Sequence, residues 1–499
     1  VLRCPAFLGR CAGLDLVSTW TYTNPSPLGV LQNADELIAM ANGEHGVCQT
    51  IQLFWYKSAA IPPADAKGEA SAAGDSVAAE DADAWGNYIT ISPAHLREAV
   101  WLALSRPVSR IQFGGASAIC DRPGSYDYTN RDTPREMERL AAELIKPYGP
   151  MLKAMPEQST DVAILSSAAS SLFGRTGSYG QTSSAFGDCH KTVSLAQLQP
   201  RLVLDETLHD AALEDVRALI LPACKVLPAS VHNAILRFAK AGGIVVADDA
   251  LGPKIPGAVR FTFPDTKQKE LTALERREAW VSAGRRLADA MRQAGFRWPV
   301  SSTSPDVILS VRNGHGARCI IVVNDRRRAG AYVGAYGRIL DDGVAQEAEL
   351  LFDAEQFGGG VFYNVSLRQR LRTVREGTQL TTRVLVPPAG GQLLYWSPRP
   401  LASVAVDAPT STRRGATMTL RFTVQDRDGV PVPGVQPLHV AISDSSSRSS
   451  SYSGYYAAVD GTFSLDVPIA INDRQGDWLV SVEDLVAGNR TSAAFTVAP

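Results

Sequence analysis

Cysteine is scarce in this sequence of 499 residues, which contains only seven. The seven are odd in number and scattered, and none of them form a C-x-x-C pair. The sequence therefore favours neither a disulfide framework nor a zinc site, and we expect reduced or buried thiols. The cysteines are Cys4, Cys11, Cys48, Cys120, Cys189, Cys224 and Cys319.

Long apolar runs and an excess of charge are also absent. No run approaches the roughly 20 residues of a membrane-spanning helix, so no membrane span is predicted. The formal net charge of −2 gives no electrostatic reason to expect nucleic acid or an anionic membrane as the main partner. The opening "VLRCPAFLGRCAGLDLVSTW" has no Met and no signal-peptide pattern. We therefore expect a processed chain or a piece of a longer protein.

Three successive pairs of a predicted strand and a predicted helix fill residues 1–155. The predicted strands are Leu14–Tyr22, Val47–Tyr56 and Val108–Ser117. Repeats of this kind predict parallel strands joined by right-handed crossovers. The last helix is expected to begin with a capping box made by Thr133 and Glu136. Residues 58–86, rich in Ala, Asp, Glu and Gly, are predicted to be a disordered insert.

The remaining chain divides into one more α/β region and an all-β region. Residues 156–300 contain continuous apolar strands such as "VRALILPAC", typical of a parallel sheet covered on both faces. Residues 301–402 and 403–499 alternate with a period of two, which predicts two antiparallel β-sandwiches of about 100 residues each. The predicted fold class is therefore multidomain α/β plus all-β.

The segment "LPACKVLPASVHNAILRFAKAGGIVVADD" predicts strand, helix, Gly-Gly and strand, with Cys224 at the end of the first strand. A thiol nucleophile needs a lowered pKa, a nearby base and a sharp exposed turn. The neighbours of Cys224 are Ala223 and Lys225, whereas an amidotransferase elbow has glycines on both sides. Cys189 and His190 are adjacent, and adjacent side chains of an extended chain point to opposite faces. Buried thiols are the favoured interpretation, with a thiol enzyme as the alternative.

Here the order of modules resembles a known family. "VRALILPACKVLPASVHNAILRFAKAGGIVVADD" resembles the trimerisation domain of glycoside hydrolase family 42 β-galactosidases, which has an amidotransferase-like fold without the catalytic cysteine. "PAHLREAVWLALSRPVSRIQFGGAS" is similar to the end of that family's catalytic (β/α)8 barrel. "INDRQGDWLVSVEDLVAGNRTSAAFTV" resembles an immunoglobulin- or macroglobulin-like extracellular module.

The resemblance implies a definite set of parts. Residues 1–155 would be the C-terminal part of the barrel, and residues 156–300 a flavodoxin-like or amidotransferase-like sheet of the trimerisation type. Two β-sandwiches would follow at 301–402 and 403–499. About five β/α units of the barrel would then be missing from this chain.

Glycoside hydrolysis normally needs two carboxylates, and in barrels these lie at the C-terminal ends of strands. The resemblance implies a Glu nucleophile after the strand that ends in "TIQLFWYKS", where the sequence has none. The weak catalytic candidates are Asp121 and Asp127, with a polar turn as the alternative reading of that loop. Strand-end aromatic side chains stack on sugar rings as well as in cores. The candidate sugar-binding residues are Trp20, Trp55, Tyr56, Tyr126 and Asn130.

Two functions therefore stand open beside the thiol enzyme. One is a β-galactosidase-like glycoside hydrolase, of which this chain is the C-terminal part, and the other is a non-catalytic carbohydrate-binding or cell-surface scaffold. Both predict a glycan or oligosaccharide partner and an extracellular, periplasmic or cell-surface location. No cofactor and no metal is expected. The resemblance also implies a homo-oligomer, a trimer or a dimer.

Overall fold

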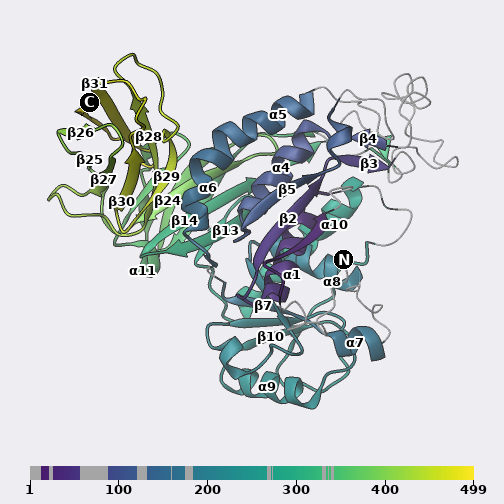
Figure 1. The fold of residues 1–499 in the computed structure, drawn as a ribbon. Coiled ribbons are helices and arrows are strands. Elements are labelled where there is room, and N and C mark those ends of the chain that lie inside the picture. The colour runs from purple at the N-terminus through teal and green to yellow at the C-terminus, as the bar shows by residue number, and fades with distance from the viewer. Residues whose placement is uncertain are drawn as a thin grey trace.

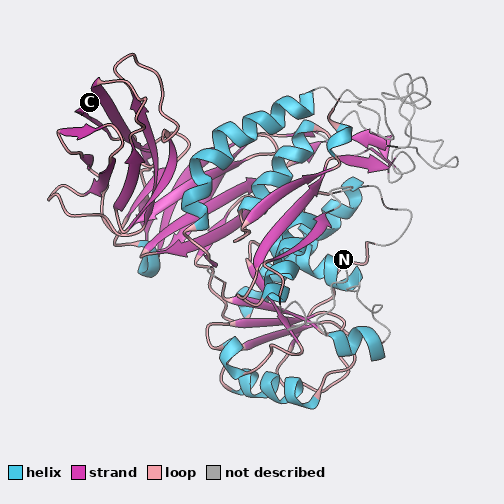
Figure 2. Ribbon diagram, viewed as in Figure 1, coloured by secondary structure: helices cyan, strands magenta, loops and turns pink. Residues whose placement is uncertain are grey.

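The structure is a computed structural model, and it combines parallel α/β sheets with large antiparallel sheets (Figure 1). Helices lie against the parallel sheets, whereas the C-terminal part is almost entirely strands (Figure 2). The predicted insert at 58–86 lies outside the described residues. The structure describes residues 13–21, 26–56, 88–120, 132–158, 160–174, 184–266, 271, 273–328, 333–334, 337–338 and 342–499.

The N-terminal sheet has three parallel strands in the order β1-β2-β5, as the strand–helix repeats predicted. Alternate residues of the central strand face the helices, and two of them, Val47 and Ile51, join the apolar core. The elements are β1 (Leu16–Thr21), α1 (Gly29–Ala41), β2 (Gly46–Gln52), α4 (Pro93–Leu104), β5 (Arg110–Gly114), η3 (Ala116–Ala118), α5 (Asp132–Leu140), the π-helical turn η4 (Ala141–Ile145) and α6 (Lys146–Lys153).

Two local predictions for this region were wrong. The predicted strand Val47–Tyr56 is two strands, because β3 (Phe54–Tyr56) leaves the parallel sheet and pairs antiparallel with β4 (Tyr88–Thr90). The capping box is also absent. Thr133 is buried and donates its hydroxyl to the carbonyl of Ile91 at 2.7 Å, while Glu136 is held by two arginines. Both side chains therefore serve tertiary contacts.

The second α/β unit is a five-stranded parallel sheet in the order β11-β10-β9-β7-β8. Its central strands are buried along their whole length, which agrees with their continuous apolar sequence. The sequence interpretation had missed α8 and β8. The elements are β7 (Val162–Ser166), α7 (Ala168–Phe173), α8 (Ser184–Leu195), β8 (Pro200–Leu204), η5 (Asp210–Leu213), β9 (Ala218–Leu221), α9 (Ala229–Lys240), β10 (Ile244–Ala247), β11 (Val259–Arg260) and α10 (Ala273–Gln293).

The next unit consists of a six-stranded sheet, β21-β20-β24-β14-β13-β6, and a four-stranded sheet, β12-β19-β23-β22. Their strands are β6 (Glu157–Gln158), β12 (Val300–Ser302), β13 (Val307–Gly314), β14 (Ala317–Asn324), β19 (Gln346–Asp353), β20 (Val361–Asn364), β21 (Gln369–Arg370), β22 (Val374–Glu376), β23 (Gln379–Val386) and β24 (Gly391–Ser397). The smaller elements are α11 (Ala354–Phe357), β15 (Arg327–Arg328), β16 (Val333–Gly334), β17 (Gly337–Arg338) and β18 (Asp342–Gly343).

The C-terminal unit differs from the two-sheet sandwich that was predicted. Eight strands form one continuously paired sheet, β25-β27-β30-β29-β28-β31-β32-β26, which curls until β25 contacts β32. Its strands are β25 (Ser403–Asp407), β26 (Ser411–Arg413), β27 (Thr417–Gln425), β28 (Val435–Ser443), β29 (Gly454–Val459), β30 (Thr462–Pro468), β31 (Gly476–Asp484) and β32 (Arg490–Ala498).

The units are packed into one body. Helix α6 lies against strands β28 and β29 of the C-terminal sheet, and α4 lies against β14. The largest apolar cluster accordingly runs without a break from Leu28 to Val497. Strand β6, which directly follows the N-terminal unit, pairs with β13 of the six-stranded sheet. Helices α4 and α6 are therefore covered by the β units, whereas α1 packs against α8 and β8 of the second α/β unit.

Candidate functional site

One face of the three-stranded sheet is covered by helices, and the other carries mostly polar side chains. The register aligns Ser18 with Cys48 and Trp20 with Thr50, so these side chains share a face. Ser18 and Thr50 form a hydroxyl–hydroxyl hydrogen bond of 3.0 Å across it. We call this side of the sheet the polar face. Its central-strand residues are buried, whereas Trp20, Arg110 and Gln112 on the flanking strands are exposed. It comprises Ser18, Trp20, Cys48, Thr50, Gln52, Arg110 and Gln112.

Trp20 is the exposed aromatic residue of the polar face, with 42% of its surface accessible. Its ring extends from β1 over Gly114, where an added Cβ would lie 2.8 Å from Cζ3 of Trp20. The ring also meets Phe54 edge-on, with centroids 6.3 Å apart. At Gly115, which has φ +88°, an added Cβ would collide with Phe54. The pair Gly114-Gly115 therefore provides the room in which two aromatic rings lie at the C-terminal end of β5.

The sequence prediction had identified Trp20 but had missed Phe54 and the two glycines. The signal was present in "QFGGAS", because two glycines directly after a strand mark a close approach of another group. Trp55 and Tyr56 belong to the β3–β4 pair beyond the end of the sheet, and their side chains lie outside the described residues. Four further candidates also lie outside them, namely Asp121, Tyr126, Asp127 and Asn130.

No carboxylate lies at the C-terminal ends of β1, β2 and β5 within the described residues 13–21, 46–56 and 110–120. The strands end in Thr21, Gln52 and Gly114. Asp15 precedes β1 at its opposite end, where its carbonyl accepts the Gly46 amide. The part of the chain that the structure describes also contains no cluster of His, Cys, Asp or Glu suited to a metal ion. The polar face, as far as the structure describes it, lacks a pair of acids.

The two thiols considered from sequence lie in cores. Cys224 is fully buried, and its thiol faces the carbonyl of Pro222 at 3.5 Å. Burial, with a further contribution from Asp248, raises the pKa of the Cys224 thiol well above its ordinary value. Burial raises the pKa of Cys189 in the same way. Since a nucleophilic cysteine needs a lowered pKa and access, this geometry argues against a thiol enzyme.

His190 makes a different contact from the one its neighbour Cys189 suggested. Its Nε2 lies 2.8 Å from Asp35 Oδ2, and Arg106 donates to the same carboxylate at 2.7 and 3.2 Å. All three side chains are at most 2% exposed. Burial opposes the ionisation of Asp35, but Arg106 and then His190 lower its pKa below the ordinary value. This cluster joins helices α1 and α8 to the turn that follows α4, and it is structural.

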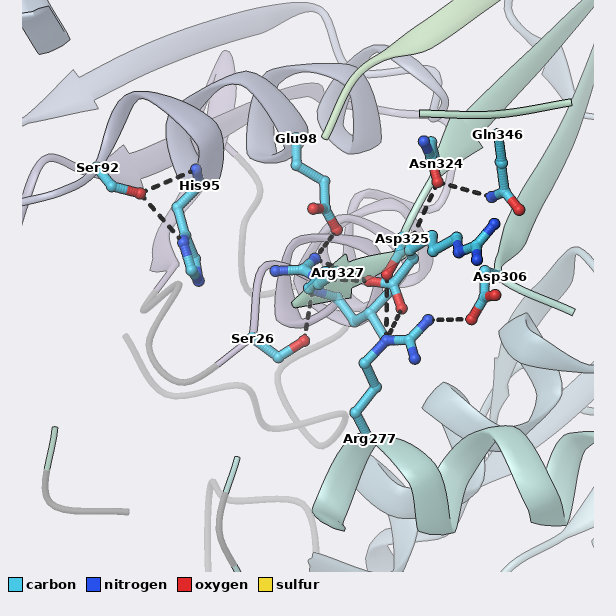
Figure 3. A network of polar contacts seen from close by, with 12 residues as sticks. Ser26, Ser92, His95, Glu98, Arg277, Asp306, Asn324, Asp325, Arg327 and Gln346 are labelled. Carbon is cyan, nitrogen blue, oxygen red and sulfur yellow. Dashed lines mark hydrogen bonds and ion pairs between the residues drawn. The ribbon is translucent and has the colours of Figure 1, made fainter. Parts of the chain in front are cut away.

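A second buried network lies between α4, α10 and the end of β14 (Figure 3). Arg327 pairs with Glu98 and, at 2.8 Å, with Asp325. Arg277 pairs with Asp325 at 2.9 Å and with Asp306. Burial raises the pKa of Glu98 well above its ordinary value; Arg327 opposes the rise and Asp325 adds to it.

The charges of this network balance when Glu98 is protonated. Two guanidinium groups then face two carboxylates, those of Asp325 and Asp306. Burial opposes the ionisation of Asp325, but Arg327 and Arg277 hold its pKa below the ordinary value. Glu98 is fully buried, so it cannot reach a substrate.

No protein-family profile and no curated protein matches the sequence. Among the described residues, no helix is both long and apolar enough to cross a membrane.

Among solved structures, several glycoside hydrolases show a similar arrangement. The α-L-fucosidase isoenzyme 2 from Paenibacillus thiaminolyticus aligns with a TM-score of 0.46 and 12% identity, covering 76% of this chain and 63% of that chain. A catalytic mutant of a family 42 β-galactosidase from G. stearothermophilus gives 0.42 and 8%, with 78% and 60% covered. The apo family 42 exo-carrageenase from Bacteroides ovatus gives 0.35 and 13%, with 61% and 39% covered.

This chain thus spans between 39% and 63% of the length of those three enzymes. All three TM-scores are below 0.5, so these likenesses carry no argument about function.

Proposed function

We propose that this chain belongs to a glycoside hydrolase-like protein and binds a carbohydrate, of the β-galactoside class, on its polar face. The observation that carries the proposal is the exposed ring of Trp20, which lies over Gly114 beside polar side chains. An aromatic ring offers a flat apolar surface, which suits the C–H side of a pyranose.

The side chains around Trp20 supply what the sugar hydroxyls need. Gln112 and Arg110, on the same face, are solvent-exposed, and Gln112 accepts a weak bond from the Cys48 thiol. An amide both donates and accepts hydrogen bonds, while a guanidinium only donates. A sugar hydroxyl, which does both, can therefore pair with either group. The choice of β-galactosides comes from the family resemblance of the sequence.

Hydrolysis needs acids that the polar face does not supply. A glycosidase of the usual kind needs two carboxylates about 5–10 Å apart, and the described strand ends have none. Asp127 and Asp121 remain the candidates on this chain, and the other acid would come from further β/α units. The alternative is a carbohydrate-binding protein without catalysis.

Calorimetric titration with lactose tests the binding. We expect Trp20→Ala to weaken binding at least about fivefold, since an aromatic contact contributes roughly 1 kcal/mol. Phe173→Ala is the matched control, because Phe173 is 76% exposed on the second α/β unit. Equal binding by the wild type and Trp20→Ala, or no binding by either, would refute the proposed site.

Release of nitrophenol from nitrophenyl β-galactoside separates the two forms of the proposal. Turnover that Asp127→Asn abolishes, with lactose binding intact, supports a hydrolase with its acid on this chain. Lactose binding without any turnover supports the binding protein.

A further inference from the structure

A groove of the described structure lies away from the polar face. It has a volume of about 740 Å³, within the roughly 300–1,000 Å³ of sites for small molecules. One wall is the side of α10 and the segment after it. The other wall is formed by residues in or next to β12, β19 and β23 of the four-stranded sheet. The groove therefore lies between the second α/β unit and the β unit.

The α10 wall is basic. Arg285 and Arg292 are seven residues apart on one side of the helix, and Arg297 follows in the next segment. Arg292 is paired with Asp289 at 2.7 Å. The guanidinium groups of Arg285 and Arg297 are exposed and have no ion pair with any described residue.

The acids of the groove do not cancel these charges. Asp289 already faces Arg292, and the carboxylate of Asp353 accepts the amides of Glu355 and Gln356 at the start of α11. The groove therefore retains a positive potential, and its charge complements an anion. A guanidinium offers parallel N–H groups that match a planar carboxylate.

The rest of the lining suits a sugar. Trp298 lies half-buried in the groove and donates its Nε1–H to the carbonyl of Ala196 at 3.2 Å. The guanidinium of Arg292 lies 5.7 Å from the centroid of its ring, which leaves the rest of the ring to a ligand. On the sheet wall, Thr303, Thr378 and Gln379 are exposed and offer donors and acceptors. An aromatic plane beside hydroxyl and amide groups is suited to a pyranose, whereas an acidic peptide would need only the arginines.

The groove is held in a fixed shape. Gln197 adopts a left-handed backbone, with φ +59°. Its side chain accepts the Ser302 amide at 2.7 Å and donates to the Ser304 carbonyl at 2.8 Å. Gly284 allows α10 to approach α8 closely, because an added Cβ would lie 2.9 Å from the Leu195 carbonyl carbon. A preformed site loses less entropy when its ligand binds.

We propose that this groove is a second carbohydrate site, specific for an oligosaccharide that bears carboxylates, such as a uronic acid oligomer. Arg285 and Arg297 bind the carboxylates, and Trp298 faces a sugar ring. The proposal does not depend on the polar face, since the two sites share no residue.

Calorimetric titration with trigalacturonate at low salt tests this site. We expect each of Arg285→Gln and Arg297→Gln to weaken binding about tenfold, the value of one charge-assisted hydrogen bond. Binding by the wild type should also weaken as NaCl is raised to 0.15 M, because the arginines are exposed. Arg286→Gln is the matched control, since Arg286 is exposed on the same helix and does not line the groove. Trp20→Ala should leave this affinity unchanged.

Three results would overturn the proposal. The first is no binding of trigalacturonate, or binding that the double variant of Arg285 and Arg297 retains. The second is equal binding of neutral galactotriose, which would show that charge plays no part. The third is tighter binding of hexaglutamate than of trigalacturonate, which would identify an acidic peptide as the ligand. Far-UV circular dichroism of the double variant establishes that it is folded before any of these results is read.

Discussion

Replacement of Glu98 by Gln should remove a specific pH dependence from the stability of this protein. Glu98 is fully buried beside Arg327 and Asp325, and its pKa is raised well above the ordinary value. In the unfolded chain a Glu has a pKa of about 4.3. Above that pH the unfolded state has released the proton while the native state still binds it. The free energy of unfolding therefore falls as the pH rises from about 4.3 towards the folded pKa.

The magnitude follows from linkage. One extra proton bound by the native state changes the free energy of unfolding by about 1.4 kcal/mol per pH unit. The glutamine of the Glu98→Gln variant cannot ionise, so the free energy of unfolding of this variant lacks this dependence on pH. Relative to wild type, its free energy of unfolding should rise by up to about 1.4 kcal/mol per pH unit above pH 4.3. Asp325, whose pKa is lowered, acts in a different window. It loses its contribution only as the pH falls below about 3.9, and it is present in both proteins.

Urea unfolding from pH 4.5 to 8, followed by tryptophan fluorescence, gives the required difference. Glu347→Gln is the control, because Glu347 is exposed on β19 and should leave the pH profile unchanged. Parallel profiles for wild type and Glu98→Gln would show that Glu98 ionises normally in the folded protein. The reasoning from burial would then be wrong.

Three further substitutions probe the other features. Asp35→Asn leaves the buried Arg106 without its counter-ion and should cost about 3–5 kcal/mol in urea unfolding; a loss below 1 kcal/mol would contradict this. Cys224→Ala should cost about 1–2 kcal/mol and leave lactose binding and any turnover unchanged, and iodoacetamide should label Cys224 only after unfolding. Loss of turnover would restore the thiol hypothesis. Gly114→Val should displace the ring of Trp20 and weaken lactose binding as Trp20→Ala does. Unchanged affinity would show that lactose binding does not depend on the position of this ring. Asp289→Asn is the control for Asp35→Asn, and Gly149→Ala is the control for Gly114→Val.

The regular elements were predictable because their signals are local. The parallel strands and the helices after them followed from apolar periodicity, and β9, α9 and β10 lie close to where the pattern put them. The strand Val47–Tyr56 failed at its second half. Nothing in "LFWY" indicates that the chain leaves the sheet after Gln52, since this depends on the pairing of β3 with β4. The single curled C-terminal sheet was missed for the same reason, because pairing between distant strands has no local signal.

The candidate site was predictable only in part. An aromatic residue at a strand end is visible in sequence, so Trp20 was named as a candidate. What makes its ring usable is Gly114, which lies 94 positions further along the chain and on another strand. Thr133 and Glu136 show the reverse case, because a valid local capping pattern was overridden by contacts to Ile91, Arg97 and Arg139. Tertiary partners decided both outcomes.

Arg312 shows how the joints between the units depend on contacts that no sequence pattern reveals. It lies on β13 and is 2% exposed, yet it faces no carboxylate in the described structure. Its guanidinium donates instead to the carbonyls of Leu104 and Arg106 at the end of α4, and of Leu152 and Met155 at the end of α6. The carbonyls at a helix C-terminus have no partner within the helix and carry the negative end of its dipole. One cation thus satisfies two helix ends at once. Burial lowers the pKa of Arg312 to about 10, so it remains charged at neutral pH. Its removal would leave both helix ends unsatisfied at the seam with the six-stranded sheet, so the N-terminal helices and the β unit are expected to unfold together.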